Sequence, residues 1–392
     1  MKLIKITALV LSVIMCVGLF AGCRSAGSKG YTANNTEYVI GLSGPLTGGA
    51  AIYGTAVKNA AQMAVDEINA AGGLNGVKFK LVATDDMHDA TKVATNYSSM
   101  MEQYGMQVSL GTVTSAPALE FKNLSVEDNV FFLTPSASAD DVPANPNGYQ
   151  MCFADGNQGK VAAEFVNANF KGQTIGAFYK SDEPYSSGIY KQFKQNLDSS
   201  VTVVETSFTD ANTTDFSVQI DTLKDCSFIF MPTYYGPASL FMTQAKDTMK
   251  ADAVYYGCDG FDGIDGIEGF DITAIPQKVT MLSHFNSKAT EGAAKTFIDK
   301  YTAKFGAETL NQFGASAYDC VYAIYGAMKK AMDAGTNIPV TISASDLCEI
   351  LKAQFSGGYT IENAVTGDKI SWNANGYVDK QAIQYVIKEA NQ

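Results

Sequence analysis

The segment Tyr38-Val39-Ile40-Gly41-Leu42 is a short β-branched and apolar run that ends in a turn rich in Gly and Pro. From Gly54 to Ala71, apolar residues recur at the spacing of a helix, and Gly72-Gly73 closes this stretch. The run from Val77 to Ala83 then has the composition of a second strand. A strand, a helix and a strand in this order predict parallel strands joined by a right-handed crossover.

The same alternation continues along the chain and restarts near Gly156, which predicts two successive αβ series. Further strands are expected at 108–110, 130–133, 174–179, 201–208, 227–231 and 253–257, and helices at 89–104, 117–127, 291–305 and 315–334. Residues 369–388 are expected to form paired strands around the turn at 373–376. The fold class is therefore predicted to be α/β, with two doubly wound parallel-sheet lobes joined by a multi-strand hinge.

Because elements remain after the second series, we expect the chain to cross between the lobes more than once. Lobe 1 is predicted to hold residues 37–155 and 286–378, and lobe 2 residues 156–285 and 379–392. A cleft between two such lobes, at the carboxyl ends of the strands, is where a small ligand would bind.

The N-terminus indicates export. Lys2 and Lys5 precede an apolar run of 16 residues, Ile6 to Ala21, which is shorter than the roughly 20 residues of a membrane span but typical of a secretory signal. The end of this run, Phe20-Ala21-Gly22-Cys23, resembles a bacterial lipobox. We therefore expect a signal peptide at 1–22, lipidation of Cys23, a flexible tether over 23–36, and a lipid-anchored location outside the cytoplasm. The alternative is a plain signal peptide that happens to be followed by a cysteine.

Composition excludes several classes of function. The chain has 392 residues, is 46% hydrophobic, and carries 28 Lys and Arg against 40 Asp and Glu, a net charge of −12. This acidic balance argues against nucleic acid as the main partner. The chain has two histidines, His88 and His284, far apart in sequence, which disfavours zinc sites and His-based triads. Neither a G-x-G-x-x-G nor a phosphate-loop motif occurs, so no cofactor and no metal are predicted.

Several motifs together resemble a known family. Ile40 to Gly48 looks like the first strand and turn of type I periplasmic solute-binding proteins, and Ala64 to Gly76 looks like their first helix end and double-Gly turn. Asp85-Asp86, Thr134-Pro135-Ser136 and Gly367 to Trp372 fit in the same order. The resemblance spans nearly all of 37–388 and is closest to the Leu/Ile/Val-binding subgroup of ABC importers.

This resemblance implies a function and partners. The chain would be no enzyme but a monomeric binding protein that captures an amino acid, of branched-chain or other apolar type, by hinge closure and delivers it to an ABC permease and its ATPase. Two alternatives stay open: a protein of the same fold for an amide, a urea-like solute or an aromatic acid, and a ligand-sensing receptor module.

The resemblance also implies ligand contacts at turns that follow strands. It assigns Ser115 and Ser138 to the carboxylate and ammonium ends of the ligand, with a backbone contact near Ser136. Ligand-contacting tyrosines would be Tyr53, Tyr185 and Tyr234. Asp259 aligns with the acidic residue that pairs with the ammonium, where the subgroup has the longer Glu. From the residues alone, Ser115 and Ser138 could instead be helix N-caps.

Two departures from the subgroup concern disulfides and acidic residues. Branched-chain binders often carry a disulfide whose positions correspond here to His88 and Thr114. Four of the five cysteines at 152–348 lie among apolar or small residues and are expected to be buried free thiols, whereas Cys258 is set apart because it lies beside an acidic turn. Acidic residues recur every third residue after the expected strand at 253–257, at Asp259, Asp262, Asp265, Glu268 and Asp271. Their spacing does not suit a calcium loop, so beyond Asp259 a solvated loop is expected.

Overall fold

The computed structural model describes residues 34–390, which contain two large sheets. The first sheet has the order β2-β1-β3-β4-β5 and is parallel throughout. Its strands are β1 (Tyr38–Gly44), β2 (Phe79–Asp85), β3 (Val108–Ser109), β4 (Phe132–Thr134) and β5 (Gly148–Gln150). The helices that accompany it are α2 (Ala51–Ala70), α3 (Val93–Glu102), α4 (Ser115–Glu127), α9 (Gly292–Phe305), α10 (Gln312–Asp333) and α11 (Ala344–Ser356). We call this sheet with these helices lobe 1.

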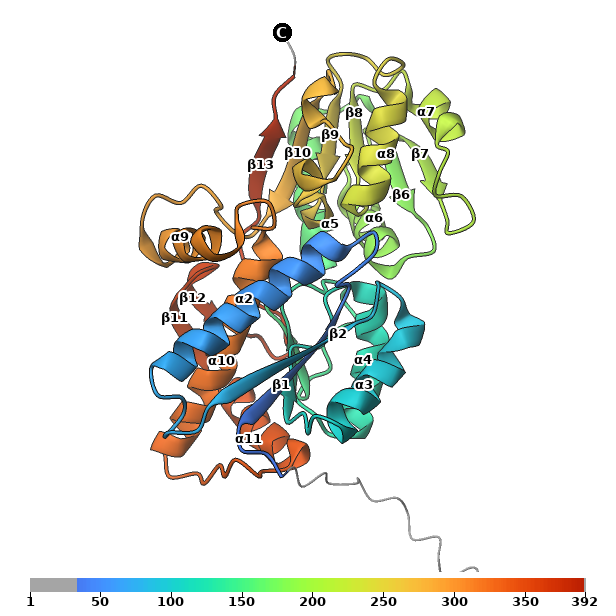
Figure 1. The fold of residues 1–392 in the computed structure, drawn as a ribbon. Helices are drawn as coiled ribbons and strands as arrows, with labels where there is room; N and C mark the ends of the chain where they lie inside the picture. The colour runs from blue at the N-terminus through green and yellow to red at the C-terminus, as the bar shows by residue number, and fades with distance from the viewer. Residues whose placement is uncertain (1–33, 391–392) are drawn as a thin grey trace, which may run out of the picture.

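The interior strand β1 is buried on both faces because helices cover the sheet on both sides. Ile40 and Leu42 pack in the cluster that contains residues of α2 and α10, whereas Val39 packs in the cluster of α3 and α4. This is the period-two alternation of a strand. In Figure 1, α2 and α10 run side by side on one side of β1, while α3 and α4 lie on the other.

The second sheet has the order β13-β10-β9-β8-β6-β7. Its strands are β6 (Thr174–Lys180), β7 (Thr202–Phe208), β8 (Phe228–Met231), β9 (Val254–Gly257), β10 (Lys278–Ser283) and β13 (Ile383–Lys388). Its helices are α5 (Asp155–Asn169), α6 (Pro184–Asn196), α7 (Ser217–Leu223) and α8 (Tyr235–Ala245). We call this unit lobe 2. The predicted α/β class with two doubly wound lobes is confirmed, with one difference: the edge strand β13 is antiparallel to β10.

The prediction that residues 369–388 form strands paired around the turn at 373–376 holds only next to that turn, where Trp372 and Val378 form an isolated antiparallel bridge. The strand β12 (Gly367–Ser371) forms a hairpin with β11 (Thr360–Ala364), and β13 joins the sheet of lobe 2. Trp372 Nε1 donates to the backbone oxygen of Gln150 at 2.7 Å, and this bond joins the end of the hairpin to β5 of lobe 1.

Within residues 34–390, the chain passes between the two sheets three times, at 151–154, 284–291 and 372–382. Side chains tie these segments to lobe 1. Lys380 is buried and its Nζ donates to Thr366 Oγ1 at 2.6 Å, while His284 Nε2 lies 2.7 Å from Ser316 Oγ on α10. Burial lowers the pKa of Lys380 to about 8. The hinge is thus a set of crossing segments anchored by buried polar contacts.

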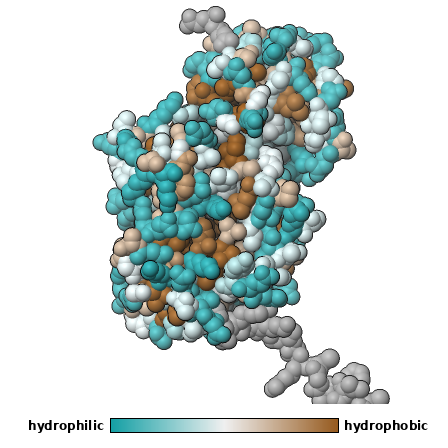
Figure 2. Space-filling view, in the orientation of Figure 1, coloured by the Kyte–Doolittle hydropathy of each residue, from teal (hydrophilic) through white to brown (hydrophobic). Residues whose placement is uncertain are grey.

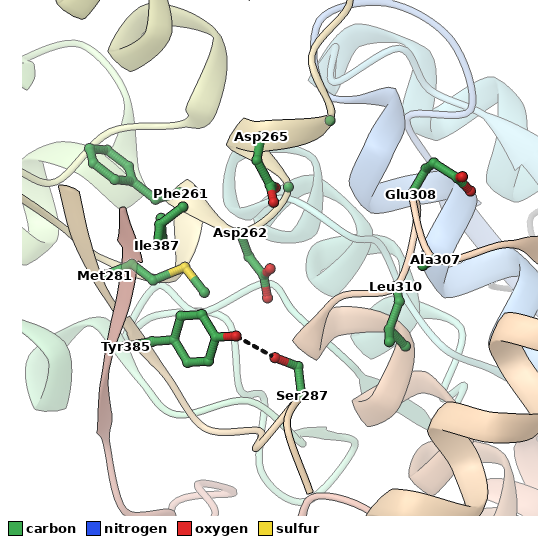
Figure 3. Close-up of a pocket in the computed structure, with 12 residues that line it drawn as sticks. Phe261, Asp262, Asp265, Met281, Ser287, Ala307, Glu308, Leu310, Tyr385 and Ile387 are labelled. Atoms are coloured by element: carbon green, nitrogen blue, oxygen red, sulfur yellow. Dashed lines mark hydrogen bonds between the residues drawn. The ribbon is translucent and has the colours of Figure 1, made fainter. Parts of the chain in front are cut away.

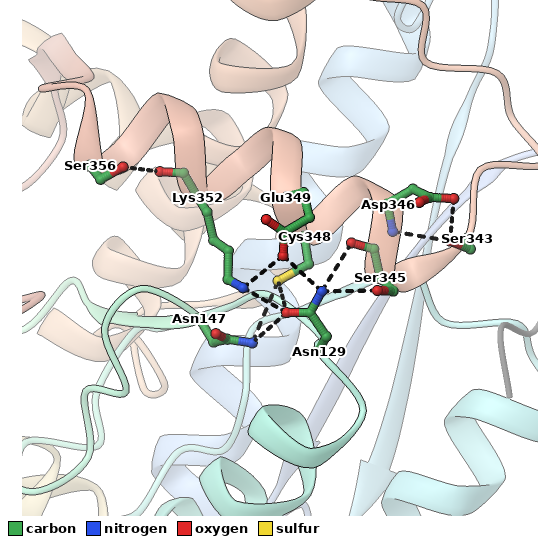
Figure 4. Close-up of polar contacts among 9 residues, drawn as sticks. All are labelled: Asn129, Asn147, Ser343, Ser345, Asp346, Cys348, Glu349, Lys352 and Ser356. Atoms are coloured by element: carbon green, nitrogen blue, oxygen red, sulfur yellow. Dashed lines mark hydrogen bonds and ion pairs between the residues drawn. The ribbon is translucent and has the colours of Figure 1, made fainter. Parts of the chain in front are cut away.

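Lobe 1 contains a polar cluster that joins the turn before β4 to α11 (Figure 4). Asn129 has a left-handed φ of 54° and stands at the centre. Its Nδ2 donates to Ser345 Oγ and to Glu349 Oε1, both at 2.9 Å, and its Oδ1 accepts from Lys352 Nζ at 2.7 Å. One side chain therefore contacts three residues on successive turns of α11.

The predictions for the signal peptide, for lipidation of Cys23 and for most of the tether fall outside the described residues. Over the part of the chain that the structure describes, no helix has the length and apolar character needed to cross a membrane. The face drawn in Figure 2 is largely hydrophilic, with apolar residues visible mainly in recesses between hydrophilic areas.

Candidate functional site

A small cavity lies in the cleft between the lobes, and we call it the inner cavity. Its volume is about 10 Å³. It is lined by Tyr53, Val113, Thr114, Ser136, Ser138 and Phe313 of lobe 1 and by Tyr185, Tyr234 and Asp259 of lobe 2. Six of the seven predicted ligand contacts line it, and Ser115 does not. Ser115 begins α4, directly after Thr114, and its Oγ accepts the N–H of Ala139 at 3.2 Å.

The folding of the sheets explains why these residues meet. Ser136 and Ser138 follow β4, Tyr234 follows β8, and Asp259 follows β9. The carboxyl ends of parallel strands lie along one edge of a sheet, so the turns after them collect in the cleft. Ser136 Oγ also donates to the backbone oxygen of Val113 at 2.7 Å, which fixes two of these turns against each other.

Asp259 is 1% exposed, and one of its oxygens is unpaired. Oδ1 accepts from the hydroxyl of Tyr185 at 2.7 Å, and that hydroxyl accepts the N–H of Gly260 at 2.9 Å. Oδ2 has no hydrogen bond in good geometry within residues 34–390, although the Gln158 side chain lies near enough to lower the pKa of this carboxyl. Burial dominates and raises the pKa of Asp259 to about 7.

Asp155 is a second buried carboxyl beside Asp259, and the sequence analysis missed it. It is the first residue of α5 and is 1% exposed. Neither of its oxygens has a hydrogen bond in good geometry with a described group, although Ser138 is near enough to lower its pKa. Burial, and after it the charge of Asp259, hold the pKa of Asp155 well above its ordinary value. Its place at the predicted lobe boundary was the signal that could have identified it.

Aromatic rings form one wall of the inner cavity. Tyr185 and Tyr234 stack with ring centres 4.5 Å apart and an angle of 7° between the planes. Tyr53 packs edge-on against Phe313 at 4.9 Å. The hydroxyl of Tyr53 also donates to the backbone oxygen of Gly260 at 2.5 Å, a hydrogen bond that joins lobe 1 to lobe 2 across the cleft.

A hydrogen bond occupies the two positions at which the resemblance places a disulfide. His88 Nδ1 lies 2.9 Å from Thr114 Oγ1. Burial, with a smaller contribution from Lys180, lowers the pKa of His88 to about 4, so its ring is neutral at neutral pH. The five cysteines in the described residues are free and buried, including Cys258, which the sequence had set apart from the others.

The prediction of a solvated acidic loop after Asp259 is wrong for Asp262. Asp262 Oδ2 accepts the N–H of Gln312 at 2.8 Å, and burial raises its pKa to about 7. Asp262 also borders a larger hollow of about 350 Å³, in which Ser287 Oγ donates to the hydroxyl of Tyr385 at 3.2 Å (Figure 3). Among the described residues, no group of three or more His, Cys, Asp or Glu is placed to hold a metal ion.

A family model described as periplasmic binding protein matches residues 37–352. The chain belongs to the periplasmic binding protein family. Membership identifies it as an extracytoplasmic solute-binding protein rather than an enzyme, and confirms the family resemblance found in the sequence.

Individual relatives of this periplasmic binding protein have names that specify ligands. A leucine-, isoleucine-, valine-, threonine- and alanine-binding protein of Pseudomonas aeruginosa is 29% identical over 81% of this chain and 84% of its own. A Leu/Ile/Val-binding protein of Rhizobium johnstonii is 32% identical over 58% of this chain and 62% of its own. Among solved structures, the LivJ protein of Streptococcus pneumoniae, a branched-chain amino acid transporter substrate-binding protein in complex with isoleucine, has a TM-score of 0.76 and 27% identity. It covers 90% of this chain and 99% of its own.

Proposed function

We propose that this chain is the substrate-binding protein of an ABC importer and captures an amino acid in the inner cavity. One observation carries the proposal. Asp259 lines the inner cavity, its carboxyl is buried, and its Oδ2 lacks a hydrogen bond among the described residues. A buried carboxylate needs a cation or donor to offset its lost hydration, and the α-ammonium of an amino acid is such a group. The names of the relatives support the same ligand class.

Each end of an amino acid has a complementary group in the cleft. The ammonium would bind Asp259 and Asp155. The carboxylate would meet the hydroxyls of Ser136 and Ser138 and the N-terminal end of α4, which begins at Ser115, because helix N-termini favour anions. An aromatic acid lacks the ammonium and would leave both buried carboxyls unpaired. That mismatch favours an amino acid over the aromatic acids considered from the sequence.

Capture requires movement of the lobes or of their side chains. The inner cavity has a volume of about 10 Å³, close to the roughly 10–15 Å³ needed for one water molecule. A larger ligand would reach this position only when the residues of lobe 1 and lobe 2 separate. Closure would then form contacts from both lobes that the open form lacks.

Replacement of the charge on Asp259 tests this proposal. We expect Asp259→Asn to weaken binding of the preferred amino acid at least about 30-fold, because loss of one partner of a buried charge pair costs about 2–5 kcal/mol. Titration calorimetry on the protein without residues 1–22 would measure this, with Asp265→Asn, an exposed residue of the same loop, as the matched control. Binding of the Asp259→Asn variant within threefold of the parent would place the ammonium site elsewhere.

We also infer that the mature protein is a monomer held at the membrane by a lipid on Cys23 and that it delivers its ligand to a permease and its ATPase. The lipobox-like segment Phe20-Ala21-Gly22-Cys23 supports the anchor. We expect Cys23→Ser to abolish incorporation of a fatty-acid probe and to release the protein from the membrane fraction. Equal labelling of parent and variant would contradict the lipid anchor.

A further inference from the structure

A second cavity, which we call the outer cavity, shares a wall with the inner one. Its volume is about 170 Å³, and its lining includes Ala50 and His88 of lobe 1 and Lys180, Glu183 and Tyr234 of lobe 2. The ring of Tyr234 lines both cavities. Thr114 of the inner cavity is hydrogen-bonded to His88 of the outer cavity. A ligand whose head lies in the inner cavity would therefore extend its side chain past Tyr234 into the outer cavity.

Glu183 brings a buried acceptor to the outer cavity. It is 3% exposed, and its Oε2 accepts the N–H of Ser186 at 2.9 Å, so the residue caps α6. Its Oε1 has no hydrogen bond in good geometry with any described group, although the Tyr234 side chain lies near enough to lower the pKa of this carboxyl. The cap needs one oxygen only, which a shorter Ser would supply equally well. Helix capping therefore leaves the second oxygen of Glu183 unexplained.

The other polar groups of the outer cavity narrow the chemistry. Lys180 Nζ is paired with Asp210 at 2.5 Å and lies 3.9 Å from Asp182, so these two carboxylates hold the ammonium group at the wall of the cavity. The neutral ring of His88 uses Nδ1 toward Thr114, which leaves Nε2 for a further partner. An aliphatic side chain would leave the buried oxygen of Glu183 unpaired, which is unfavourable. A cationic side chain would meet the like charge of Lys180.

We propose that the preferred ligand is an amino acid whose side chain ends in a primary amide, and that the outer cavity is the subsite for this amide. The amide N–H would donate to Glu183 Oε1, and the amide oxygen would accept from two other polar side chains that line the cavity, His88 and Lys180. This proposal rests on the proposed function and narrows it. It departs from the names of the relatives, which specify Leu, Ile, Val, Thr and Ala, amino acids without a side-chain amide.

Calorimetry with glutamine and methionine tests the proposal without any substitution. The two ligands have unbranched side chains of similar length, and glutamine alone carries the amide. We expect the parent protein to bind glutamine at least about 10-fold more tightly than methionine or leucine. Equal or tighter binding of methionine or leucine would overturn the amide subsite while leaving the proposed function intact. If no amino acid binds, the proposed function fails and the subsite fails with it.

A variant of Glu183 tests the residue itself. Glu183→Ser keeps a helix cap but removes the carboxyl from the outer cavity, so we expect glutamine affinity to fall at least about 10-fold and methionine affinity to change less than threefold. Asp252→Asn, at an exposed residue of lobe 2 that lines neither cavity, is the control and should leave both affinities unchanged. An equal loss for glutamine and methionine would assign Glu183 a structural role and overturn the proposal. A thermal unfolding curve would show whether the Glu183→Ser variant is folded. If the variant is unfolded, the preference of the parent protein for glutamine over methionine decides whether the amide subsite exists.

Discussion

At the scale of single residues, the unusual feature of the cleft is that Asp155 and Asp259 are both buried with oxygens that lack hydrogen bonds. Burial keeps protons on such groups, because the charged form is poorly solvated. An arriving ammonium has the opposite effect and favours the charged form. Binding and proton release are therefore coupled at this pair.

The coupling predicts how affinity changes with pH. The pKa of Asp259 is about 7 in this fold, so below pH 7 the protein must release a proton before the carboxylate can pair with an ammonium. We expect affinity for the amino acid to rise between about pH 5 and pH 7 and then to level off, by up to about tenfold per pH unit for one released proton. Calorimetry in buffers of different ionisation enthalpy would detect the proton. Affinity that is constant from pH 5 to 7 would contradict the coupling.

The stability of the protein without ligand should change in the opposite direction. The folded-state pKa of Asp259 lies above its unfolded value of 3.8, so the folded form holds more protons between about pH 4 and 7. Its contribution to the free energy of unfolding therefore decreases as pH rises through this interval. Ligand should restore more stability at pH 7 than at pH 5.

At the scale of secondary-structure elements, α11 is attached to the rest of lobe 1 partly through Asn129 (Figure 4). We expect Asn129→Ala to lower the free energy of unfolding by about 2 kcal/mol, because it removes these hydrogen bonds and places a Cβ-bearing residue without a polar side chain at a left-handed φ. Asn129→Gly is the control, because it loses the same bonds but tolerates the backbone conformation. Urea unfolding would measure both. If the Asn129→Gly variant is no more stable than the Asn129→Ala variant, the left-handed backbone conformation makes no contribution to the loss.

Elements were predictable where local periodicity determines them. The expected strand at 174–179 and helix at 291–305 differ from β6 and α9 by a single residue at one end. The start of α2 was placed at Gly54, three residues late. The structure gives a reason for this glycine, because a Cβ there would lie 2.1 Å from the backbone oxygen of Pro45. The pairing of β13 with β10 depends on contacts about 100 residues apart, which no local pattern reveals.

The candidate site was predictable only in part, for a related reason. Turns after strands could be recognised, and Tyr185 and Asp259 were placed there from the family resemblance. Asp155 and Glu183 could not be identified in this way. They stand out because they are buried and have oxygens without hydrogen bonds, and both properties depend on packing between distant segments. The boundaries of the lobes stay a prediction.

At the scale of the whole molecule, the lobes contact each other directly across the cleft. Besides the bond from Tyr53 to Gly260, Gln192 Nε2 donates to Asp140 Oδ2 at 3.3 Å. We expect a saturating amino acid to reduce the radius of gyration in small-angle X-ray scattering, because the ligand adds contacts that are made only when the lobes are closed. The Asp259→Asn variant at the same ligand concentration should keep the larger radius. An unchanged curve for the parent would mean that the ligand does not bind between the lobes.

Because all five described cysteines are buried, the protein is well suited to be labelled as a fluorescent sensor of its ligand. A thiol that water cannot reach does not react with a maleimide dye, so a cysteine introduced on the rim of the cleft would be labelled selectively once Cys23 is replaced. Closure of the cleft would change the surroundings of the dye, so its fluorescence would report ligand binding directly. The five buried cysteines would need no replacement, so the core would keep its packing.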